Sequence, residues 1–206
     1  MFPFYQFYLM NSSEKIGISI WGSGTGSNAQ VLIDFFSDNN WGEIRLIVCD
    51  RPCYLADRAV NQNFPLWLPS EQDRKNPIKI LEQMAQHNIQ VVVLAGYLRK
   101  VNPLFLKSFT GLVLNLHPSL LPAYGGKGMY GSAVHSAVIE AKEVESGITI
   151  HEVSDEYDTG TIWRQEKIKI NSEWDALDLA KEIQKLEHKF LPIVVQDACK
   201  KILHKQ

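Results

Sequence analysis

The sequence predicts an α/β fold, with a mostly parallel, Rossmann-like sheet, helices on both faces and an antiparallel strand near the C-terminal part. Short apolar segments with strand character alternate with segments of helical periodicity, a pattern typical of parallel sheets built from right-handed β-α-β units. A glycine-rich turn joins the first strand to the first helix. The 206 residues, 45% of them hydrophobic, suffice for one core of this kind. We therefore expect a single domain over 14–206, after an N-terminal extension over 1–13.

Seven segments have the features of strands. Residues 90–95 (QVVVLA) form a continuous apolar run, as expected of a strand buried on both faces. Residues 147–154 (GITIHEVS) alternate between apolar and polar, and residues 161–170 are expected to return in the antiparallel direction. The expected strands are 16–21, 45–49, 64–68, 90–95, 112–114, 147–154 and 161–170.

Helical segments lie between most of these strands. Residues 29–36 carry apolar side chains at helical spacing, and Pro77 suits the first position of a helix. Residues 174–189 are amphipathic, and we expect Pro192 to begin a separate final helix. The expected helices are 29–36, 54–63, 77–87, 102–108, 132–142, 174–189 and 192–203. The stretch 70–76 is polar, and no helix or strand is assigned to it.

The glycine-rich turn at 22–28 (GSGTGSN) lies between a strand and a helix. This arrangement points backbone N–H groups and the positive end of the helix dipole at a phosphate. A dinucleotide fingerprint starting at Gly22 needs glycine at position 27, where the chain has Ser27. A nicotinamide site with Asp50 as its ribose-binding acid, and a purely structural turn with a helix cap, remain the alternatives.

Residues 112–122 (LVLNLHPSLLP) contain the strongest candidate for a chemical site. Side chains alternate along a strand, so Asn115 and His117 project from the same face. Pro118 cannot donate to a ladder, and the chain is expected to turn there. An amide and an imidazole thus stand at the carboxyl end of a buried strand, the edge where open α/β sheets bind ligands. A structural core histidine is the alternative.

Three motifs resemble those of the folate-dependent formyltransferases: NLHPSLLPAY at 115–124, GSGTGSN at 22–28 and DEYD at 155–158. The combination is most similar to the branch that formylates 5-phosphoribosylglycinamide, and the similarity extends over residues 16–203. It implies the formyltransferase fold and transfer of a formyl group from 10-formyltetrahydrofolate, as co-substrate, to the glycinamide amine. This is the third step of purine synthesis, and it requires no metal and no covalent nucleophile.

The resemblance implies a catalytic group of Asn115, His117 and Asp158. The Asn115 amide suits the oxyanion that develops during transfer. His117 can give and take protons near neutral pH, and a carboxylate at Asp158 would favour its protonated form. Only the resemblance brings Asp158 near the other two, because a solvated acidic turn explains residues 155–158 equally well. His151 is implied as a supporting residue.

The resemblance also implies two binding groups. The substrate residues are Thr25, Gly26, Ser27, Asn28, Gln184 and Glu187, with the turn at 25–28 suited to a phosphate monoester. The folate residues are Arg74, Leu98, Arg99, Val101 and Asn115. Solvated surface positions remain the alternative for Gln184, Glu187 and the two arginines.

The net charge and the cysteine content limit the binding partners and the cellular compartment that we expect. The formal net charge of −2 gives no basic field for nucleic acid or a membrane, so we expect only small-molecule partners and a monomer or homodimer. Cys49, Cys53 and Cys199 have no second Cys or His pair at metal spacing and are expected to be free thiols in the reducing cytoplasm, with a zinc site as the alternative. The aromatic stretch 1–10 lacks the features of a signal peptide. Met10 as the true start, and a leader that covers an apolar patch, are the two interpretations of this stretch.

Two other functions remain open at this point. The first is formyl transfer to a different amine, such as that of a sugar nucleotide. The second is a nucleotide-binding module without turnover, in which His117 would have no chemical role.

Overall fold

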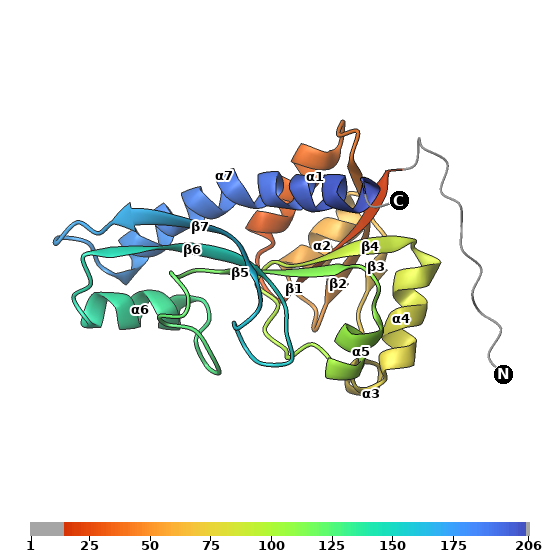
Figure 1. Ribbon diagram of the computed structural model, residues 1–206, viewed down its shortest axis with the longest axis horizontal. Coiled ribbons are helices and arrows are strands. Elements are labelled where there is room, and N and C mark those ends of the chain that lie inside the picture. Colours follow the sequence, from red (N-terminus) through yellow and green to blue (C-terminus); the bar gives the residue numbers. More distant parts are fainter. Residues whose placement is uncertain (1–14, 205–206) are drawn as a thin grey trace.

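The computed structural model describes residues 15–204, so the predictions for the N-terminal extension and for Met10 lie outside the described residues. Seven strands form one sheet in the order β3-β2-β1-β4-β5-β6-β7 (Figure 1). Strands β1 to β5 pair in parallel, whereas β6 pairs antiparallel with both β5 and β7. The predicted α/β fold class and its antiparallel C-terminal part are confirmed.

The strands and helices follow the predicted order with small differences at their ends. The strands are β1 (Ile16–Gly22), β2 (Gly42–Cys49), β3 (Leu66–Trp67), β4 (Ile89–Leu94), β5 (Leu112–His117), β6 (Glu145–Glu152) and β7 (Ile162–Lys169). The helices are α1 (Ser27–Phe36), α2 (Tyr54–Asn61), α3 (Glu71–Lys75), α4 (Pro77–Gln86), α5 (Pro103–Ser108), α6 (Ser132–Glu140) and α7 (Ala176–Leu203). No helix in the described part of the chain combines the length and the apolar character needed to cross a membrane.

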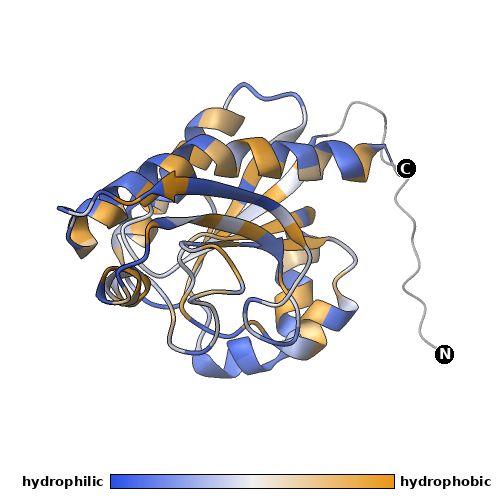
Figure 2. Cartoon of the chain, turned by 60° about the vertical axis from the view of Figure 1, so that its left-hand side comes forward, coloured by the Kyte–Doolittle hydropathy of each residue, from blue (hydrophilic) through white to orange (hydrophobic). Residues whose placement is uncertain are grey.

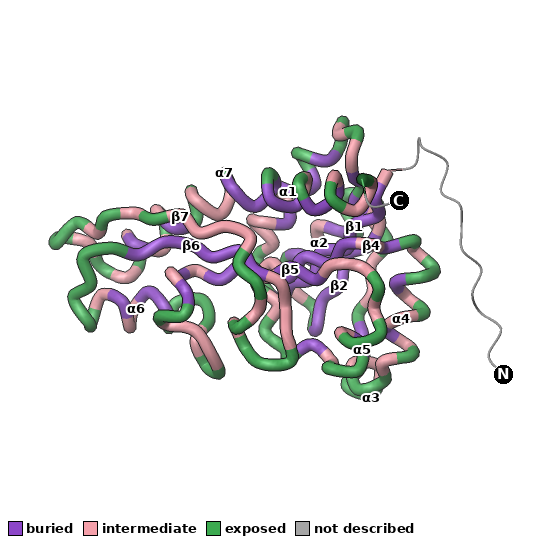
Figure 3. The backbone as a smooth tube through the Cα atoms, in the orientation of Figure 1, coloured by how far each residue is buried: buried purple, intermediate pink, exposed green. Residues whose placement is uncertain are grey.

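Two apolar clusters pack on opposite faces of the sheet. Helices α1, α2, α6 and α7 contribute to the first, and α4 and α5 contribute to the second (Figure 1). Hydrophobic residues are concentrated on the central strands, which are also the most continuously buried segments (Figures 2 and 3). Along β5, Leu114 and Leu116 belong to the first cluster and Val113 to the second. The alternation therefore directs Asn115 and His117 to the same face as Val113.

Helix α7 is one continuous helix of 28 residues with Pro192 inside it. The prediction of two helices, over 174–189 and 192–203, is wrong. A proline inside a helix costs about 3 kcal/mol because it removes one hydrogen bond and crowds the preceding turn. Burial of a large apolar side chain contributes about 1.5–3 kcal/mol, and four such residues flank the proline: Phe190, Leu191, Val194 and Val195. Packing on the sheet outweighs the local preference.

The polar stretch 70–76 contains the short helix α3, which its composition alone did not predict. Ser70 and Asp73 form a capping box, in which the Asp73 N–H donates to Ser70 Oγ at 3.1 Å and the Ser70 N–H donates to Asp73 Oδ2 at 2.9 Å. The spacing of a serine and an acid three residues later is a signal for such a helix start. The expected strand at 64–68 is reduced to the two residues of β3.

Gly147 provides a test of the close packing between β6 and β7. A Cβ atom at this position would lie 1.9 Å from the Glu166 carbonyl oxygen, so the two strands would have to separate. We expect Gly147→Ala to lower the free energy of unfolding by about 1–3 kcal/mol, as other overpacking substitutions do. Urea denaturation followed by circular dichroism measures the change. Gly24→Ala is the control because its Cβ would meet nothing within 4 Å; equal losses in both variants would contradict this account.

Candidate active site

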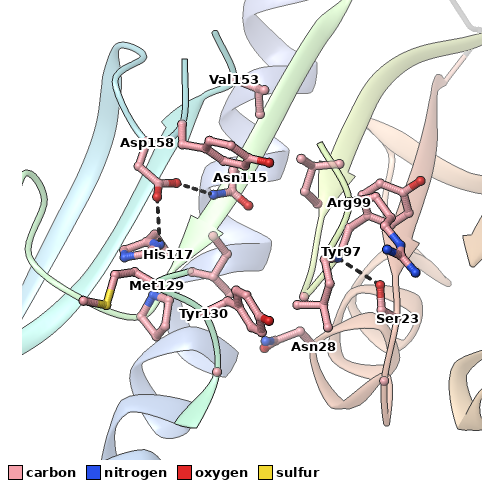
Figure 4. Close-up of a pocket in the computed structure, with 18 of the residues that line it drawn as sticks. Ser23, Asn28, Tyr97, Arg99, Asn115, His117, Met129, Tyr130, Val153 and Asp158 are labelled. Atoms are coloured by element: carbon pink, nitrogen blue, oxygen red, sulfur yellow. Dashed lines mark hydrogen bonds and ion pairs between the residues drawn. The ribbon is translucent and has the colours of Figure 1, made fainter. Parts of the chain in front are cut away.

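A cavity of about 920 Å³ opens at the carboxyl ends of the parallel strands. Its walls come from the glycine-rich turn after β1, the loop after β4, the end of β5, the glycine loop 125–131, the acidic turn after β6 and helix α7. The sheet thus brings together segments that are distant in the sequence (Figure 4). The cavity lies at the edge where an α/β sheet is expected to bind ligands.

Asn115 stands near the end of β5, directly opposite His151 of the antiparallel strand β6. Its Nδ2 atom lies 3.1 Å from His151 Nε2 and 3.4 Å from Asp158 Oδ1. His151 Nδ1 lies 2.7 Å from the Glu152 carbonyl oxygen, which can only accept. A neutral His151 therefore carries its proton on Nδ1, and its Nε2 lone pair accepts from Asn115. The cross-strand pair fixes the orientation of the amide.

His117 ends β5 two residues later, and its side chain is almost completely buried. Its Nε2 atom lies 2.9 Å from the Tyr124 carbonyl oxygen, so this nitrogen carries a proton and donates. The other ring nitrogen, Nδ1, faces Asp158 Oδ2 at 3.7 Å. The loop that follows Pro118 thereby selects which nitrogen of His117 exchanges a proton.

Asp158 comes from the acidic turn between β6 and β7, and its two oxygens lie near the imidazoles of His117 and His151. Figure 4 shows it beside His117 and Asn115. Its backbone has φ of 56°, in the left-handed region, which aspartate and asparagine tolerate better than most residues. The Gly126 N–H donates to Asp158 Oδ2 at 2.8 Å and ties the glycine loop to the carboxylate. The side chains of Asn115, His117 and Asp158 therefore lie close together, as the predicted grouping requires.

The surroundings of His117 and Asp158 lower the pKa of both side chains. Burial lowers the pKa of His117, and this effect outweighs the neighbouring Asp158 charge and the Tyr124 carbonyl, both of which favour the charged ring. Burial alone would raise the pKa of Asp158, but the neighbouring His151 side chain, the hydrogen bond from the Gly126 N–H and the proximity of His117 lower it overall. A neutral imidazole beside an ionised carboxylate is the resting state at neutral pH.

The glycine-rich turn forms the opposite wall together with α7. Gly26 has φ of 74° at the start of α1, a conformation that glycine adopts without strain. Asn28 Nδ2 donates to Glu187 Oε2 at 2.9 Å, and Gln184 Nε2 donates to Ser27 Oγ at 3.2 Å. Burial raises the pKa of Glu187, partly offset by the bond from Asn28. Thr25, Asn28, Gln184 and Glu187 line the cavity, whereas Gly26 and Ser27 do not.

The residues assigned to folate are only partly brought together. Leu98, Arg99 and Val101 line the cavity. Arg74 does not: its Nη1 donates to the Pro69 carbonyl at 2.7 Å, and the residue borders a separate, very small cavity. Arg74 therefore lies off the main cavity, because its guanidinium reaches back from α3 to Pro69, just before this helix.

The carboxylate of Asp50 is not available to bind a ribose. Arg51 and Arg99 both donate to it, and its side chain is fully buried. This arrangement argues against the nicotinamide alternative.

Several cavity residues were not identified from the sequence. Met129 and Tyr130 come from the glycine loop, and Tyr157 from the acidic turn. Ile183 lies beside Gln184 on the α7 face that borders the cavity; the helical spacing of 180, 183, 184 and 187 was the available signal. His135 of α6 also lines the wall, and its Nδ1 is buried without a partner. Within residues 15–204 no cluster of three or more His, Cys, Asp or Glu side chains has the arrangement of a metal site.

Comparison with known proteins gives a consistent result. The family model described as "Formyl transferase" matches residues 17–195. The chain is 35% identical over 185 residues to the phosphoribosylglycinamide formyltransferase of Bacillus subtilis, covering 86% of this chain and 92% of that protein. It is 34% identical over 189 residues to the chloroplastic enzyme of the same name from Arabidopsis thaliana, covering 88% of this chain and 65% of the longer plant protein. The crystal structure of glycinamide ribonucleotide transformylase 1 from Geobacillus kaustophilus superposes with a TM-score of 0.80 at 30% identity, covering 89% and 98% of the two chains.

The pKa of His117 tests the pairing with Asp158. Because the carboxylate raises this pKa against the effect of burial, we expect Asp158→Asn to lower the pKa of His117 further below its ordinary value. Titration of the ring by NMR measures the shift. Asparagine also tolerates the left-handed backbone at position 158, which keeps the turn intact.

Asp155→Asn is the matched control for this titration. Asp155 is on the same turn but is exposed and pairs with Lys107 at 3.0 Å, so its loss should leave the pKa of His117 unchanged. A wild-type pKa of His117 in Asp158→Asn would refute the electrostatic coupling.

Proposed function

The chain belongs to the formyl transferase family, and we propose that it transfers a formyl group from 10-formyltetrahydrofolate to the amine of 5-phosphoribosylglycinamide. One observation carries the proposal: a single cavity joins the group of Asn115, His117 and Asp158 to the glycine-rich turn. One molecule bound across the cavity can therefore place its amine beside the first group and its phosphate at the turn. Formyl transfer to phosphoribosylglycinamide is also the activity in the names of both relatives.

Asn115 supplies the donor for the developing oxyanion. Its bond to His151 is the shorter of its two contacts, and the 3.4 Å contact to Asp158 is near the limit of a hydrogen bond. The second N–H is therefore the one that turns to the substrate oxygen, while His151 holds the first. The donor co-substrate supplies the formyl group, and Asn115 stabilises the charge that forms when the amine adds to it.

His117 moves the proton, and Asp158 balances its charge. With Nε2–H donated to Tyr124, the lone pair on Nδ1 is the base that accepts the proton of the attacking amine. The ionised Asp158 at 3.7 Å stabilises the imidazolium that results. The same imidazolium then returns a proton to the departing nitrogen, directly or through a water held by Asp158.

The opposite wall binds the amine substrate. The turn at 25–28, with Thr25 and Asn28 on the cavity wall, and the start of α1 receive the phosphate monoester, as helix starts do for anions. Glu187 and Gln184 lie beside them on α7 and suit the ribose hydroxyls, because their side-chain oxygens can accept hydrogen bonds from hydroxyl groups. Leu98, Arg99 and Val101 form the wall for the folate co-substrate.

We also propose that the protein acts on small molecules in the cytoplasm. All three cysteines are free, and Cys49 and Cys199 are buried, which suits a reducing compartment.

Loss of formyl-folate, followed spectroscopically with 5-phosphoribosylglycinamide as the acceptor, tests the function. We expect turnover by the wild-type protein, and none by His117→Ala despite retained ligand binding. A folded wild-type protein that formylates only a sugar nucleotide amine, or that binds without turnover, would overturn the proposal.

The Asn115 side chain should contribute to kcat more than to binding. Removal of one oxyanion donor lowers kcat by about 10²–10³, so we expect a loss of this size for Asn115→Ala with smaller changes in both KM values. Steady-state kinetics at saturating folate measures it. Gln86→Ala, which truncates an exposed amide on α4 away from the cavity, is the control and should retain wild-type kcat. A loss below about tenfold in Asn115→Ala would be too small for the assigned role.

A further inference from the structure

Asp50 is a buried carboxylate that the proposed reaction does not use. It follows the last residue of β2, and its side chain has no exposed surface. Arg99 Nε donates to its Oδ2 at 2.8 Å, and Arg51 donates to both oxygens at 3.2 and 2.9 Å. Burial alone would raise the pKa of Asp50, but hydrogen bonds from Arg51, Ser23 and Arg99 lower it overall. The group is therefore ionised and fully occupied by protein donors.

These contacts link Asp50 to one wall of the cavity. Ser23 Oγ accepts from the Leu98 N–H at 2.9 Å, and the Ser23 N–H donates to the Gly96 carbonyl at 3.1 Å. Leu98 and Arg99 line the cavity and are themselves exposed, with 53% of the Arg99 side chain accessible. Figure 4 shows Ser23 and Arg99 across the cavity from His117 and Asp158. Asp50 is the fixed point to which this exposed wall is attached.

We propose that Asp50 is a positioning residue for the folate co-substrate. It binds Nε of the Arg99 guanidinium and thereby fixes the orientation of the two terminal nitrogens, which stay free to bind the ligand. The inference rests on the proposed function, in which Arg99 belongs to the folate wall. A free arginine side chain populates many rotamers, and ligand binding is stronger when that rotamer entropy is lost beforehand. Asp50 also fixes Ser23, and through it the backbone of Leu98.

Charge and position have opposite effects here, which makes the inference testable. Asp50, Arg51 and Arg99 together carry one surplus positive charge. Removal of the Asp50 charge leaves two, which would attract the carboxylates of a folate more strongly. A purely electrostatic role therefore predicts a lower KM for 10-formyltetrahydrofolate in Asp50→Asn. A positioning role predicts a higher KM, because the guanidinium loses its anchor.

The experiment measures kcat and both KM values for Asp50→Asn, Arg99→Lys and the double variant. We expect each single variant to raise the KM for 10-formyltetrahydrofolate roughly tenfold, with kcat and the KM for 5-phosphoribosylglycinamide within about twofold of wild type. Lysine keeps the charge at position 99 but cannot bind Asp50 and present a planar fork at once. The double variant should be no worse than either single variant, since both remove one interaction.

Arg51→Lys is the matched control. Arg51 pairs with the same carboxylate and is 45% exposed, but it does not line the cavity, so its KM for folate should stay within about twofold of wild type. An unchanged or lower folate KM in Asp50→Asn overturns the inference, as does an equal rise in Arg51→Lys. If Asp50→Asn does not fold, Arg99→Lys tests the same contact from its other side, because a surface arginine tolerates replacement; an unchanged folate KM there overturns the inference too. Wild-type turnover with 5-phosphoribosylglycinamide tests the proposed function separately.

Discussion

The carboxylate of Asp158, held between two buried imidazoles, is the contact on which the candidate site depends. It receives the Gly126 N–H and lies beside Asn115, His117 and His151. A buried carboxylate without such partners would be costly and would take up a proton. The hydrogen bonds keep it charged, and its charge partly offsets the effect of burial on His117. The catalytic group and the glycine loop are consequently one electrostatic unit.

The change of strand direction in the sheet explains why these groups meet. Strand β5 is parallel to β4 but antiparallel to β6. Its carboxyl end therefore lies at the cavity with those of β1 and β4, while β6 runs back past it and places His151 opposite Asn115. The turn that follows β6 begins near this point and brings Asp158 over β5. The antiparallel pairing of β6 with β5, after helix α6 has joined the two strands, therefore brings these groups together.

Local rules were sufficient for some parts of the site and insufficient for others. Strand alternation and the proline after His117 correctly predicted that Asn115 and His117 share a face at a strand end. Nothing local predicted Asp158, because its position depends on the course of two later strands, and only the family resemblance indicated it. Pro192 misled the helix prediction because burial on the sheet exceeded its local cost. Arg74 borders a separate small cavity, and charge alone does not show where a side chain points.

Helix α7 passes from the cavity to the far end of the sheet without interruption. Gln184 and Glu187 border the cavity, and a few residues later Phe190 to Cys199 pack into the first apolar cluster. One residue added between these two parts would turn everything beyond it by about 100° and advance it by 1.5 Å. Either the polar pair or the apolar stripe would then face the wrong way. The spacing along this helix is thus far less free to drift over evolutionary time than the identity of its outward-facing residues.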